Sequence, residues 1–214
     1  MRLVLMQFIS LDGVTQGPGA PDEDSSDGFG RGGWFVPYLE EGFLGIIQGW
    51  VEPCDAYLFG RRTYTAFARD WPNMPDLDDP VAKSLNTLPK YVASNTLAES
   101  EATWAPTTVL RGDITAAVAE LKAQDGRELQ IHGSTTLGRS LLDAGLVDEL
   151  RLVVAPVVVG DGRRLFEPSD HATGLRLVDA TTTPLGLAVQ TYAVEGPAEF
   201  GTYDPAVHPQ PDDT

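Results

Sequence analysis

The chain has 214 residues, and its 42% hydrophobic and 8% aromatic content is enough to bury a sizeable core in one large domain or two small ones. Its formal charge of −16 argues against nucleic acids and anionic membrane surfaces as partners, because a polyanion is repelled unless a local basic patch overcomes the field. The apolar start, residues 1–10, is too short to span a membrane and lacks a cleavage site, and no other run approaches about 18 apolar residues. We therefore expect a cytoplasmic globular protein with no nucleic-acid or membrane partner.

Cysteine and histidine usage narrows the chemistry further. The single cysteine, Cys54, excludes an internal disulfide. The three histidines, His132, His171 and His208, are too widely spread for a metal-ligand cluster to be read. We expect no bound metal, and we interpret His132 as a packed residue at a strand end.

The first fifty residues predict a strand, a long loop and a helix. Residues 2–10 form a near-continuous apolar run, which fits a strand covered on both faces near the centre of a sheet. Residues 12–33 are rich in Gly, Asp and Pro, so they predict a loop, and a loop of this length is usually a lid or a surface excursion. Over residues 34–51 apolar side chains recur about every 3.6 positions, which predicts a helix with one buried face, and Pro37 suits its first turn.

Strands and helices then alternate. A helix should begin directly after Gly60, a short helical piece lies near residues 81–85, and Asp113 can cap a further helix. The strands predicted in this part of the chain are residues 56–59, 90–94, 107–110 and 128–132.

The stretch from residue 128 to residue 166 is the most informative part of the chain. It predicts a strand, a glycine turn, a helix ended by Gly145 and a long strand over residues 148–160. The turn HGS at residues 132–134 would place backbone amides at a helix start just beyond a strand, which is where α/β proteins hold phosphates.

The last strands are connected differently. Residues 175–180 and 187–194 flank the turn at residues 184–186 without a helix between them, so they should pair antiparallel. The order of elements predicts an α/β fold with a mixed, mostly parallel central sheet, helices on both faces and antiparallel C-terminal strands. Residues 1–195 would form one domain, and residues 196–214, with four prolines, an acidic Pro-rich tail that is disordered or lies along a partner.

Five motifs together resemble one known family. They are SLDG at residues 10–13, FGRRTY at 59–64, VASNT at 92–96, HGSTTLGRSLLDAGLVDEL at 132–150 and APVVVGDGRRLF at 155–166. Over residues 1–195 the chain is similar to the dihydrofolate reductase-like superfamily, and within it to stand-alone relatives of the C-terminal reductase domain of the bifunctional riboflavin-biosynthesis protein. The resemblance implies a dihydrofolate reductase-like three-layer α/β/α fold, an NADPH-dependent reductase activity and a homodimer formed through the C-terminal strands.

The resemblance also places the cofactor NADPH along the turns that follow the second to fifth strands. The turn after the second strand would lie beside the phosphates, those after the third and fourth near the adenosine 2′-phosphate, and that after the fifth around the pyrophosphate. Cations and helix starts suit such phosphates. Taken singly, the glycines are also explained as turn residues, and Ser134 and Thr135 as N-caps. The residues implied are Gly60, Arg61, Arg62, Thr63, Ser94, Asn95, Thr96, Arg111, Gly133, Ser134, Thr135 and Thr136.

The candidates for the substrate side are Asp12, Trp34 and Glu41, with Glu40 as the neighbouring acid. Asp12, at the end of the first strand, could bind a substrate N–H or relay a proton, or it could be a turn carboxylate bonded to nearby amides. Trp34 could stack on a planar heterocycle or anchor the helix in the core. True dihydrofolate reductases carry their key acid on the first helix, where this chain offers Glu40 and Glu41, and either of these could merely face solvent.

Two charged segments bear on the substrate. The long loop carries four acids within residues 22–27, which would repel a phosphorylated substrate if the loop closed over the site. The pair Arg163 and Arg164 is either an anion contact or a solvated pair at a strand end. We expect an NADPH-dependent reductase of a small planar heterocycle, pteridine- or pyrimidine-like, of which 5-amino-6-(5-phosphoribosylamino)uracil is one possibility. The alternative is a non-catalytic nucleotide- or ligand-binding protein of the same fold.

Overall fold

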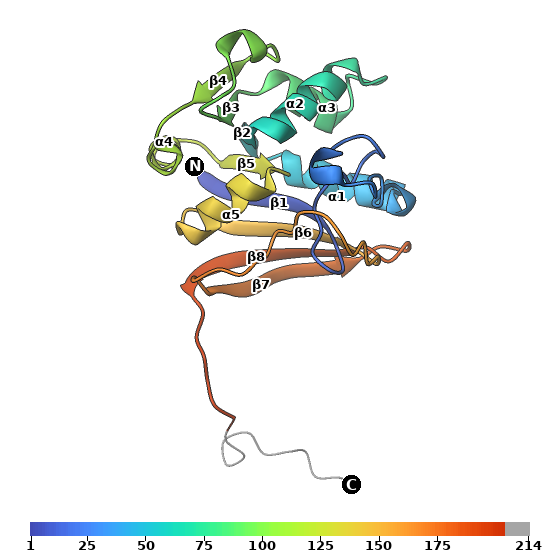
Figure 1. Cartoon of the computed structure of the whole chain (residues 1–214), viewed down its shortest axis with the longest axis vertical. Helices are drawn as coiled ribbons and strands as arrows, with labels where there is room; N and C mark the ends of the chain where they lie inside the picture. The colour runs from blue at the N-terminus through green and yellow to red at the C-terminus, as the bar shows by residue number, and fades with distance from the viewer. Residues whose placement is uncertain (204–214) are drawn as a thin grey trace.

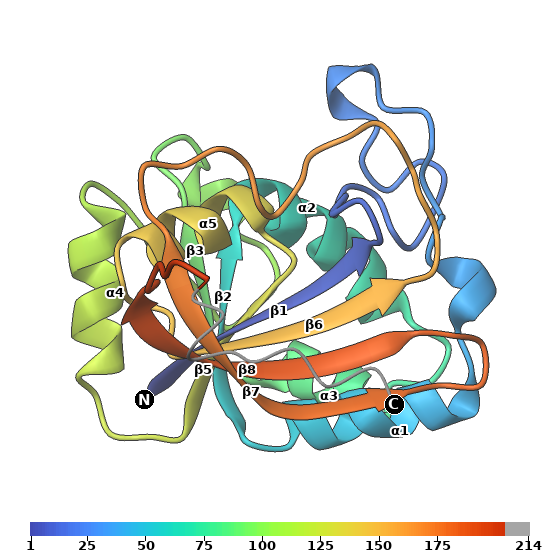
Figure 2. The same ribbon diagram turned by 90° about the horizontal axis from the view of Figure 1, so that it is seen from below.

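The computed structural model describes residues 1–203, which form one eight-stranded sheet with helices on both faces (Figures 1 and 2). The strands are β1 Arg2–Ser10, β2 Cys54–Gly60, β3 Lys90–Ala93, β4 Thr107–Leu110, β5 Glu128–His132, β6 Glu149–Ala155, β7 Thr173–Thr182 and β8 Ala188–Pro197. The helices are α1 Glu41–Val51, α2 Arg61–Asp70, α3 Pro80–Thr87, α4 Ile114–Lys122 and α5 Thr135–Asp143. Short 3-10 turns lie at Ser26–Gly28, Val36–Tyr38, Trp71–Asn73 and Glu99–Glu101.

The strand order is β4-β3-β2-β5-β1-β6-β8-β7. The strands from β4 to β6 in this order run parallel, while β8 is antiparallel to both β6 and β7. This confirms the predicted α/β class, the central position of β1 and the antiparallel C-terminal pair. It also puts the carboxyl ends of the parallel strands along one edge of the sheet, where α/β proteins bind their ligands.

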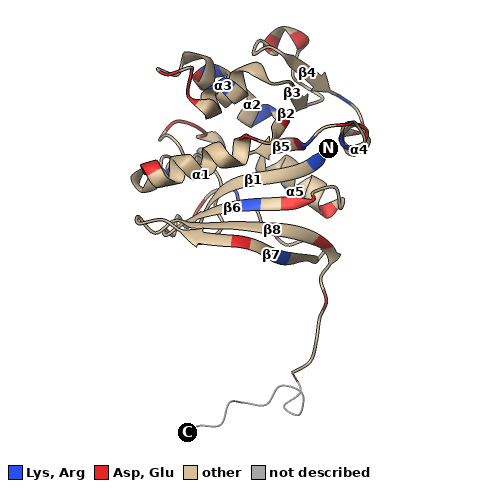
Figure 3. Ribbon diagram, turned by 180° about the vertical axis from the view of Figure 1, so that it is seen from behind, with Lys and Arg blue, Asp and Glu red and all other residues tan. Residues whose placement is uncertain are grey.

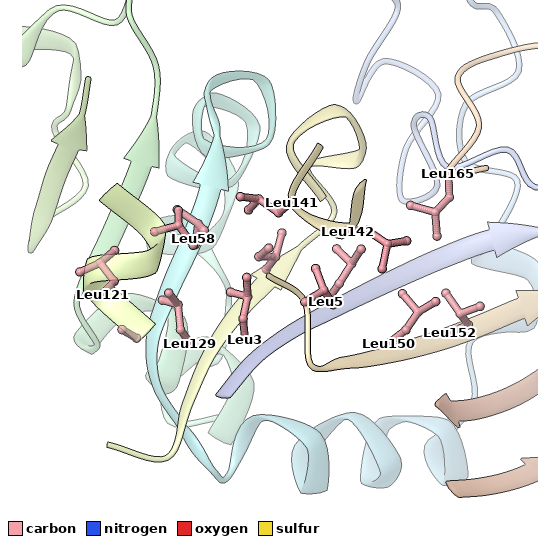
Figure 4. Packing of buried hydrophobic residues seen from close by; sticks show 14 of the residues in the cluster. Leu3, Leu5, Leu58, Leu121, Leu129, Leu141, Leu142, Leu150, Leu152 and Leu165 are labelled. Atoms are coloured by element: carbon pink, nitrogen blue, oxygen red, sulfur yellow. The ribbon is translucent and has the colours of Figure 1, made fainter. Parts of the chain in front are cut away.

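Leucine side chains hold one helical layer on the sheet (Figure 4). Leu5 of β1 and Leu129 of β5 are fully buried in a cluster with Val118 of α4 and Leu141 of α5. Burial of one such side chain contributes about 1.5–3 kcal/mol. α4 and α5 therefore cover the same face of the sheet.

Aromatic side chains dominate the opposite face. Phe43 of α1 meets Phe8 of β1 edge-on, with ring centroids 5.6 Å apart. Tyr64 of α2 and Leu85 of α3 are buried in a second cluster with Phe59 of β2. α1, α2 and α3 thus form the third layer, as the three-layer prediction requires.

The helix predicted over residues 34–51 is shorter than expected. α1 begins at Glu41, and Pro37 lies in a separate 3-10 turn. Trp34 and Phe35 fit the apolar period of the helix but are buried loop residues, 9% and 2% exposed. The prediction was therefore too long because the apolar period extended from the helix into the buried residues of the preceding loop.

The strand predicted over residues 148–160 ends at Ala155. Pro156 has no amide hydrogen, so it cannot continue the hydrogen-bond ladder. Beyond it, the amides of Val159 and Gly160 bond to the side chain of Asp12 and not to a neighbouring strand.

The end of the sheet lies slightly beyond the predicted domain boundary at residue 195. β8 continues to Pro197, and the Ala198 amide donates to the Ala172 carbonyl at 2.9 Å. The predicted tail, residues 196–214, therefore begins inside a strand, and its residues 204–214 lie outside the described part. Within residues 1–203 no helix is long and apolar enough to cross a membrane.

Candidate functional site

The turns predicted to hold the cofactor lie at the carboxyl edge of the parallel strands (Figure 2). β2 and β5 are neighbours, so the turn from Gly60 into α2 lies beside the turn from His132 into α5. β3 and β4 bring Ser94 and Arg111 to the same edge, further from the centre of the sheet. These turns therefore share one edge of the sheet, while their contact with a cofactor stays a prediction.

Two hydrogen bonds join the two central turns, and a third holds Ser134 within its own turn, an arrangement we call the clasp. The Gly60 amide donates to Ser134 Oγ at 3.0 Å, and the Ser134 amide donates to Thr63 Oγ1 at 2.9 Å. Ser134 Oγ in turn donates to the His132 carbonyl at 3.1 Å. The Ser134 side chain makes no capping bond to α5, so the interpretation of Ser134 as a simple N-cap is wrong.

The backbone at the clasp is left-handed. Gly133 and Ser134 both have φ of +55°, which suits glycine but costs about 1–3 kcal/mol for serine. A Cβ atom on Gly133 would lie 3.3 Å from Thr63 Cγ2. Glycine is therefore favoured at position 133 by both conformation and space, and the bonds of the clasp hold Ser134 in its strained form.

Helix starts and two arginines make the clasp suitable for an anion. The first-turn amides of α2 and α5 have no intrahelical acceptor, and the helix dipole favours negative charge there. Arg61 and Arg62 are exposed on the first turn of α2 and form no ion pair within the described residues. Basic residues are sparse over the whole chain, 15 Lys and Arg against 31 Asp and Glu (Figure 3). Two adjacent unpaired arginines are therefore a distinctive local charge.

The turn after β3 is built by its own side chains. Ser94 Oγ accepts from the amides of Thr96 and Leu97 at 3.2 and 3.0 Å. Asn95 Oδ1 accepts from the Gly112 amide at 2.7 Å, which ties this turn to the one after β4. Ser94 is buried and shapes the turn, whereas Asn95 and Thr96 are exposed and accessible to a ligand.

Arg111 closes the same turn from the other side. Its guanidinium donates to the carbonyls of Ser94 and Leu97 at 3.3 and 2.6 Å and to Glu99 at 3.1 Å. These bonds direct the guanidinium toward the backbone of the turn. A direct contact of Arg111 with a 2′-phosphate stays a prediction.

Asp12 is engaged on both carboxylate oxygens. It accepts from the amides of Val159 and Gly160 at 2.9 and 2.8 Å, from Ser10 Oγ at 2.7 Å and from Arg164 at 3.2 Å. The hydrogen bond from Ser10, together with those from the two amides and Arg164, holds the pKa of Asp12 well below its usual range. These contacts match the second interpretation of Asp12, a turn carboxylate bonded to nearby amides. They also hold the segment after β6 in place.

The other two predicted substrate contacts differ in burial. Trp34 is 9% exposed, and its Nε1 donates to the Gln16 carbonyl at 2.8 Å, so it anchors the long loop in the core. Glu41 is exposed at the start of α1 and has no hydrogen bond or ion pair within residues 1–203. Its neighbour Glu40 accepts from the Leu185 amide in the β7–β8 turn at 3.1 Å. Within residues 1–203, neither Glu40 nor Glu41 forms a hydrogen bond with the clasp.

The long loop is fastened to the segment after β6. Arg163 forms ion pairs with Asp24 and, at 2.8 Å, with Asp27, while Arg164 pairs with Asp12 at 3.2 Å. The Arg163–Arg164 pair is therefore occupied by carboxylates of this chain and is not a simple solvated pair. Two of the four loop acids are neutralised, so the expected repulsion of a phosphorylated substrate is weaker than their number implies.

The loop also reaches the clasp. Thr15 Oγ1 lies 2.7 Å from Thr135 Oγ1 in the first turn of α5. The Thr15 amide donates to the Arg163 carbonyl at 2.9 Å. The loop thus connects the start of α5 to the segment after β6.

Sequence reasoning missed the polar side chains inside the central strands. Gln7 is 1% exposed, and its Nε2 donates to the Gly133 carbonyl behind the clasp. His132 is buried, as predicted, and its Nε2 lies 2.9 Å from Gln130 Oε1. Burial, and then the nearby Arg151 charge, lowers the pKa of His132 to about 3. The available signal was Gln7 within the apolar run of β1 and the alternation of polar and apolar residues along β5.

Two cavities lie away from the predicted cofactor residues. The larger, about 270 Å³, is lined by Arg139, Leu142, Asp143, Leu165, Phe166, Glu167, Ser169, His171, Thr173 and Leu175. The smaller, about 200 Å³, lies beside Arg163 and Phe29. In the described part of the chain no group of three or more His, Cys, Asp or Glu side chains could hold a metal ion.

Known proteins share this architecture. Uncharacterized protein YyaP of Bacillus subtilis (strain 168) is 26% identical over 197 residues, covering 91% of this chain and 96% of its own. The crystal structure of a putative riboflavin biosynthesis protein from Shewanella sp. PV-4 aligns with a TM-score of 0.65 at 21% identity, over 91% of this chain and 99% of that one. A pyrimidine reductase-like protein from Corynebacterium diphtheriae aligns with a TM-score of 0.58 at 15% identity, over 91% and 92%. The RibD C-terminal domain matches residues 2–189, and the chain therefore belongs to the RibD C-terminal domain family.

Proposed function

We propose that this protein is an NADPH-dependent reductase that transfers a hydride to a small planar heterocycle of the pteridine or pyrimidine type. Membership of the RibD C-terminal domain family supports a pyrimidine-reductase-like function. The observation that carries the cofactor assignment is the clasp between Gly60, Thr63 and Ser134, which sets two helix starts side by side next to two unpaired arginines.

The residues around the clasp fit a dinucleotide with a 2′-phosphate. The first-turn amides of α5, at Thr135 and Thr136, would bind the pyrophosphate. Arg61 and Arg62 would bind the 2′-phosphate, with the exposed Asn95 beyond them. The nicotinamide ring, when bound, supplies the hydride. Residues 12–33, held to the start of α5, would exclude water from that ring.

On the substrate side, we propose that Asp12 acts by fixing neighbouring backbone and not as an unbonded carboxylate. With its oxygens engaged by Val159, Gly160 and Arg164, Asp12 would act on a substrate by positioning the segment after β6. Trp34 and Glu41 stay predicted substrate contacts. Trp34 would hold the long loop in place beside the substrate. Glu41 would contact the substrate directly from the exposed start of α1.

Calorimetric titration of the purified protein with NADPH and, in parallel, NADH tests the proposal. We expect micromolar binding of NADPH with a clear preference over NADH, because only the former carries the phosphate that the arginines would bind. Absence of binding by both nucleotides would reject the reductase assignment.

The second candidate is a ligand-binding protein of the same fold that does not turn over. The observation in its favour is that neither acid at the start of α1 is bonded to the clasp, since the Glu40 side chain bonds to the Leu185 amide and Glu41 faces solvent. Oxidation of NADPH, followed by absorbance with a panel of pteridines and pyrimidines, separates the two functions. Binding without oxidation across the panel would favour the non-catalytic protein.

The outer edge of the sheet supports a homodimer as a further proposal. β7 is an edge strand, and its side chains Leu177 and Val178 are 54% and 53% exposed. A long edge strand with exposed apolar residues is a template for pairing with another chain. We expect the protein to elute as a dimer with light scattering detection, and Leu177→Lys to shift it to the monomer. A monomeric wild-type protein would contradict the proposal.

A further inference from the structure

A row of polar side chains runs along β5 beneath α1. Glu128, Gln130 and His132 alternate with apolar residues, so they project from the same face of the strand. They are 4%, 0% and 8% exposed, and Arg151 of β6, 7% exposed, joins them through Glu128. Buried polar groups are tolerated only when they are hydrogen-bonded, so every atom of this row that is sealed from solvent needs a partner.

The bonding of the row has one consistent direction. Arg151 can only donate, and it donates to Glu128 Oε1 at 2.8 Å and to the Trp50 carbonyl at 3.0 Å. One end of the Gln130 amide lies 2.7 Å from both Glu128 Oε2 and the Trp50 carbonyl. Both of these are acceptors, so this end must be the nitrogen. The other end is then the oxygen, and it lies 2.9 Å from His132 Nε2, which must carry the hydrogen.

This direction leaves His132 Nδ1 as an acceptor. Burial keeps the imidazole neutral by lowering its pKa to about 3, so only one ring nitrogen is protonated. Within residues 1–203 nothing bonds to Nδ1, whereas every side-chain nitrogen or oxygen sealed from solvent there has a partner. Nδ1 therefore lies on the small part of His132 that is open to solvent.

The ring lies next to the clasp. His132 is the last residue of β5, directly before Gly133, and it is in register with Met6 of the central strand. Tyr57 of β2 packs edge-on against the imidazole, with ring centroids 5.0 Å apart. The imidazole ring is thus held at the carboxyl edge of the sheet, with β2 on one side of β5 and β1 on the other. It lies on the face of the sheet that α1 covers.

We propose that His132 Nδ1 accepts a hydrogen bond from an N–H group of the heterocycle bound in the site, and that the row from Arg151 to Gln130 holds the ring in the form that makes this possible. The N–H group belongs either to the carboxamide of the nicotinamide or to a pterin-like substrate. The identity of the ligand rests on the proposed function, whereas the fixed form of the ring does not.

The form of the ring is measured without a ligand. Nitrogen NMR of histidine-labelled protein distinguishes the two neutral tautomers, and the chain has only three histidines to assign. We expect His132 in the Nε2–H form, and a mixture of tautomers in Gln130→Leu, which removes the acceptor. An Nδ1–H form in the wild-type protein would overturn the proposal whether or not NADPH binds.

A pair of variants then separates the two ring nitrogens. His132→Asn keeps an amide near the position of Nδ1 and loses the contact with Gln130, whereas His132→Gln keeps an amide near Nε2 and loses Nδ1. We expect His132→Gln to weaken ligand binding about tenfold and His132→Asn to change it less than about threefold, with thermal unfolding as the control for folding. The opposite order would show that His132 serves only the internal row.

Three probes identify the source of the N–H group. NADPH carries the carboxamide, its reduced 3-acetylpyridine analogue has an acetyl group with no N–H, and 7,8-dihydrobiopterin carries ring N–H groups. If the nicotinamide is the donor, His132→Gln weakens NADPH but not the analogue; if the substrate is the donor, it weakens only the pterin. Equal affinities of wild type and His132→Gln for all three probes would overturn the proposal, while a wild-type protein that binds none of them would reject the proposed function.

Discussion

The chain places two pairs of adjacent arginines after strands of the same sheet, and it uses them in opposite ways. Arg61 and Arg62, after β2, are exposed and form no ion pair within residues 1–203. Arg163 and Arg164, after β6, have side chains only 22% and 39% exposed and bind carboxylates of the loop that follows β1. One pair remains available to a ligand, and the other fastens a loop.

The difference lies in the acids that the fold brings to each pair. Asp24 and Asp27 lie 139 and 136 positions from Arg163 in the sequence, yet both contact it. No carboxylate of the described residues forms an ion pair with Arg61 or Arg62. An arginine pair after a glycine is therefore either open to solvent or bound to carboxylates according to its long-range partners, although both pairs share the local sequence Gly-Arg-Arg.

The largest effect should follow removal of the fastener. Arg163→Ala would leave the partly buried Asp24 without its cation and would also remove the hydrogen bonds to Ser26 and Asp27, so we expect a loss of about 3 kcal/mol in the free energy of unfolding. Denaturant unfolding measures it. The matched control is Arg69→Ala, which removes an exposed pair with Asp70 and should change stability by less than about 0.5 kcal/mol. Equal effects of the two variants would show that the loop does not depend on Arg163.

A smaller loss should follow removal of the partner of Arg164. Asp12→Ala leaves the Val159 and Gly160 amides without an acceptor, which costs about 2 kcal/mol. Because folding lowers the pKa of Asp12, its contribution is complete above the ordinary value of 3.8 and is lost as the pH falls toward the lower value of the folded state. The stability difference between wild type and Asp12→Asn, measured by unfolding at a series of pH values, should therefore shrink as the solution is acidified below that value. A constant difference would contradict the assignment.

The free pair should affect binding and leave stability unchanged. We expect Arg61→Ala or Arg62→Ala to weaken NADPH binding about tenfold, or about 1.4 kcal/mol, while NADH binding and unfolding remain as in the wild type. Arg69→Ala, on the same helix, serves again as the control. If neither variant changes the preference for NADPH over NADH, the assignment of the 2′-phosphate to this pair is wrong.

The fold was predictable where the pattern is local. The continuous apolar run of β1 gave its central position, and the HGS turn gave the junction between β5 and α5. The errors arose where one residue had two explanations. Trp34 fits the period of α1 but anchors a loop, and Pro156 lies within an apolar run that cannot remain a strand without its amide.

The turns of the candidate site were predictable in position, but the contacts of each side chain were not. Parallel strands place their following turns at one edge, so the sequence located these turns but not the hydrogen bonds of the clasp. The role of Ser134 depends on Gly60, which is 74 positions away, and that of Arg111 depends on carbonyl groups that only the folded turn presents. No local pattern contains such partners, which is why a turn residue, a cap and a ligand contact look alike in the sequence.

The clasp also depends on the order in which the sheet is completed, and so would the binding of the proposed ligand. It joins Thr63 to Ser134 across 71 positions, and it can form only after β5 has inserted between β1 and β2. A chain that had assembled only its first four strands would have the start of α2 but not the β5–α5 turn that completes the clasp. A dinucleotide held across the clasp would therefore select the finished topology, adding about 2.7 kcal/mol at a hundredfold excess over its Kd. If that ligand were scarce, β5 and the turn after it would lack this added stabilisation and would open to proteases more readily.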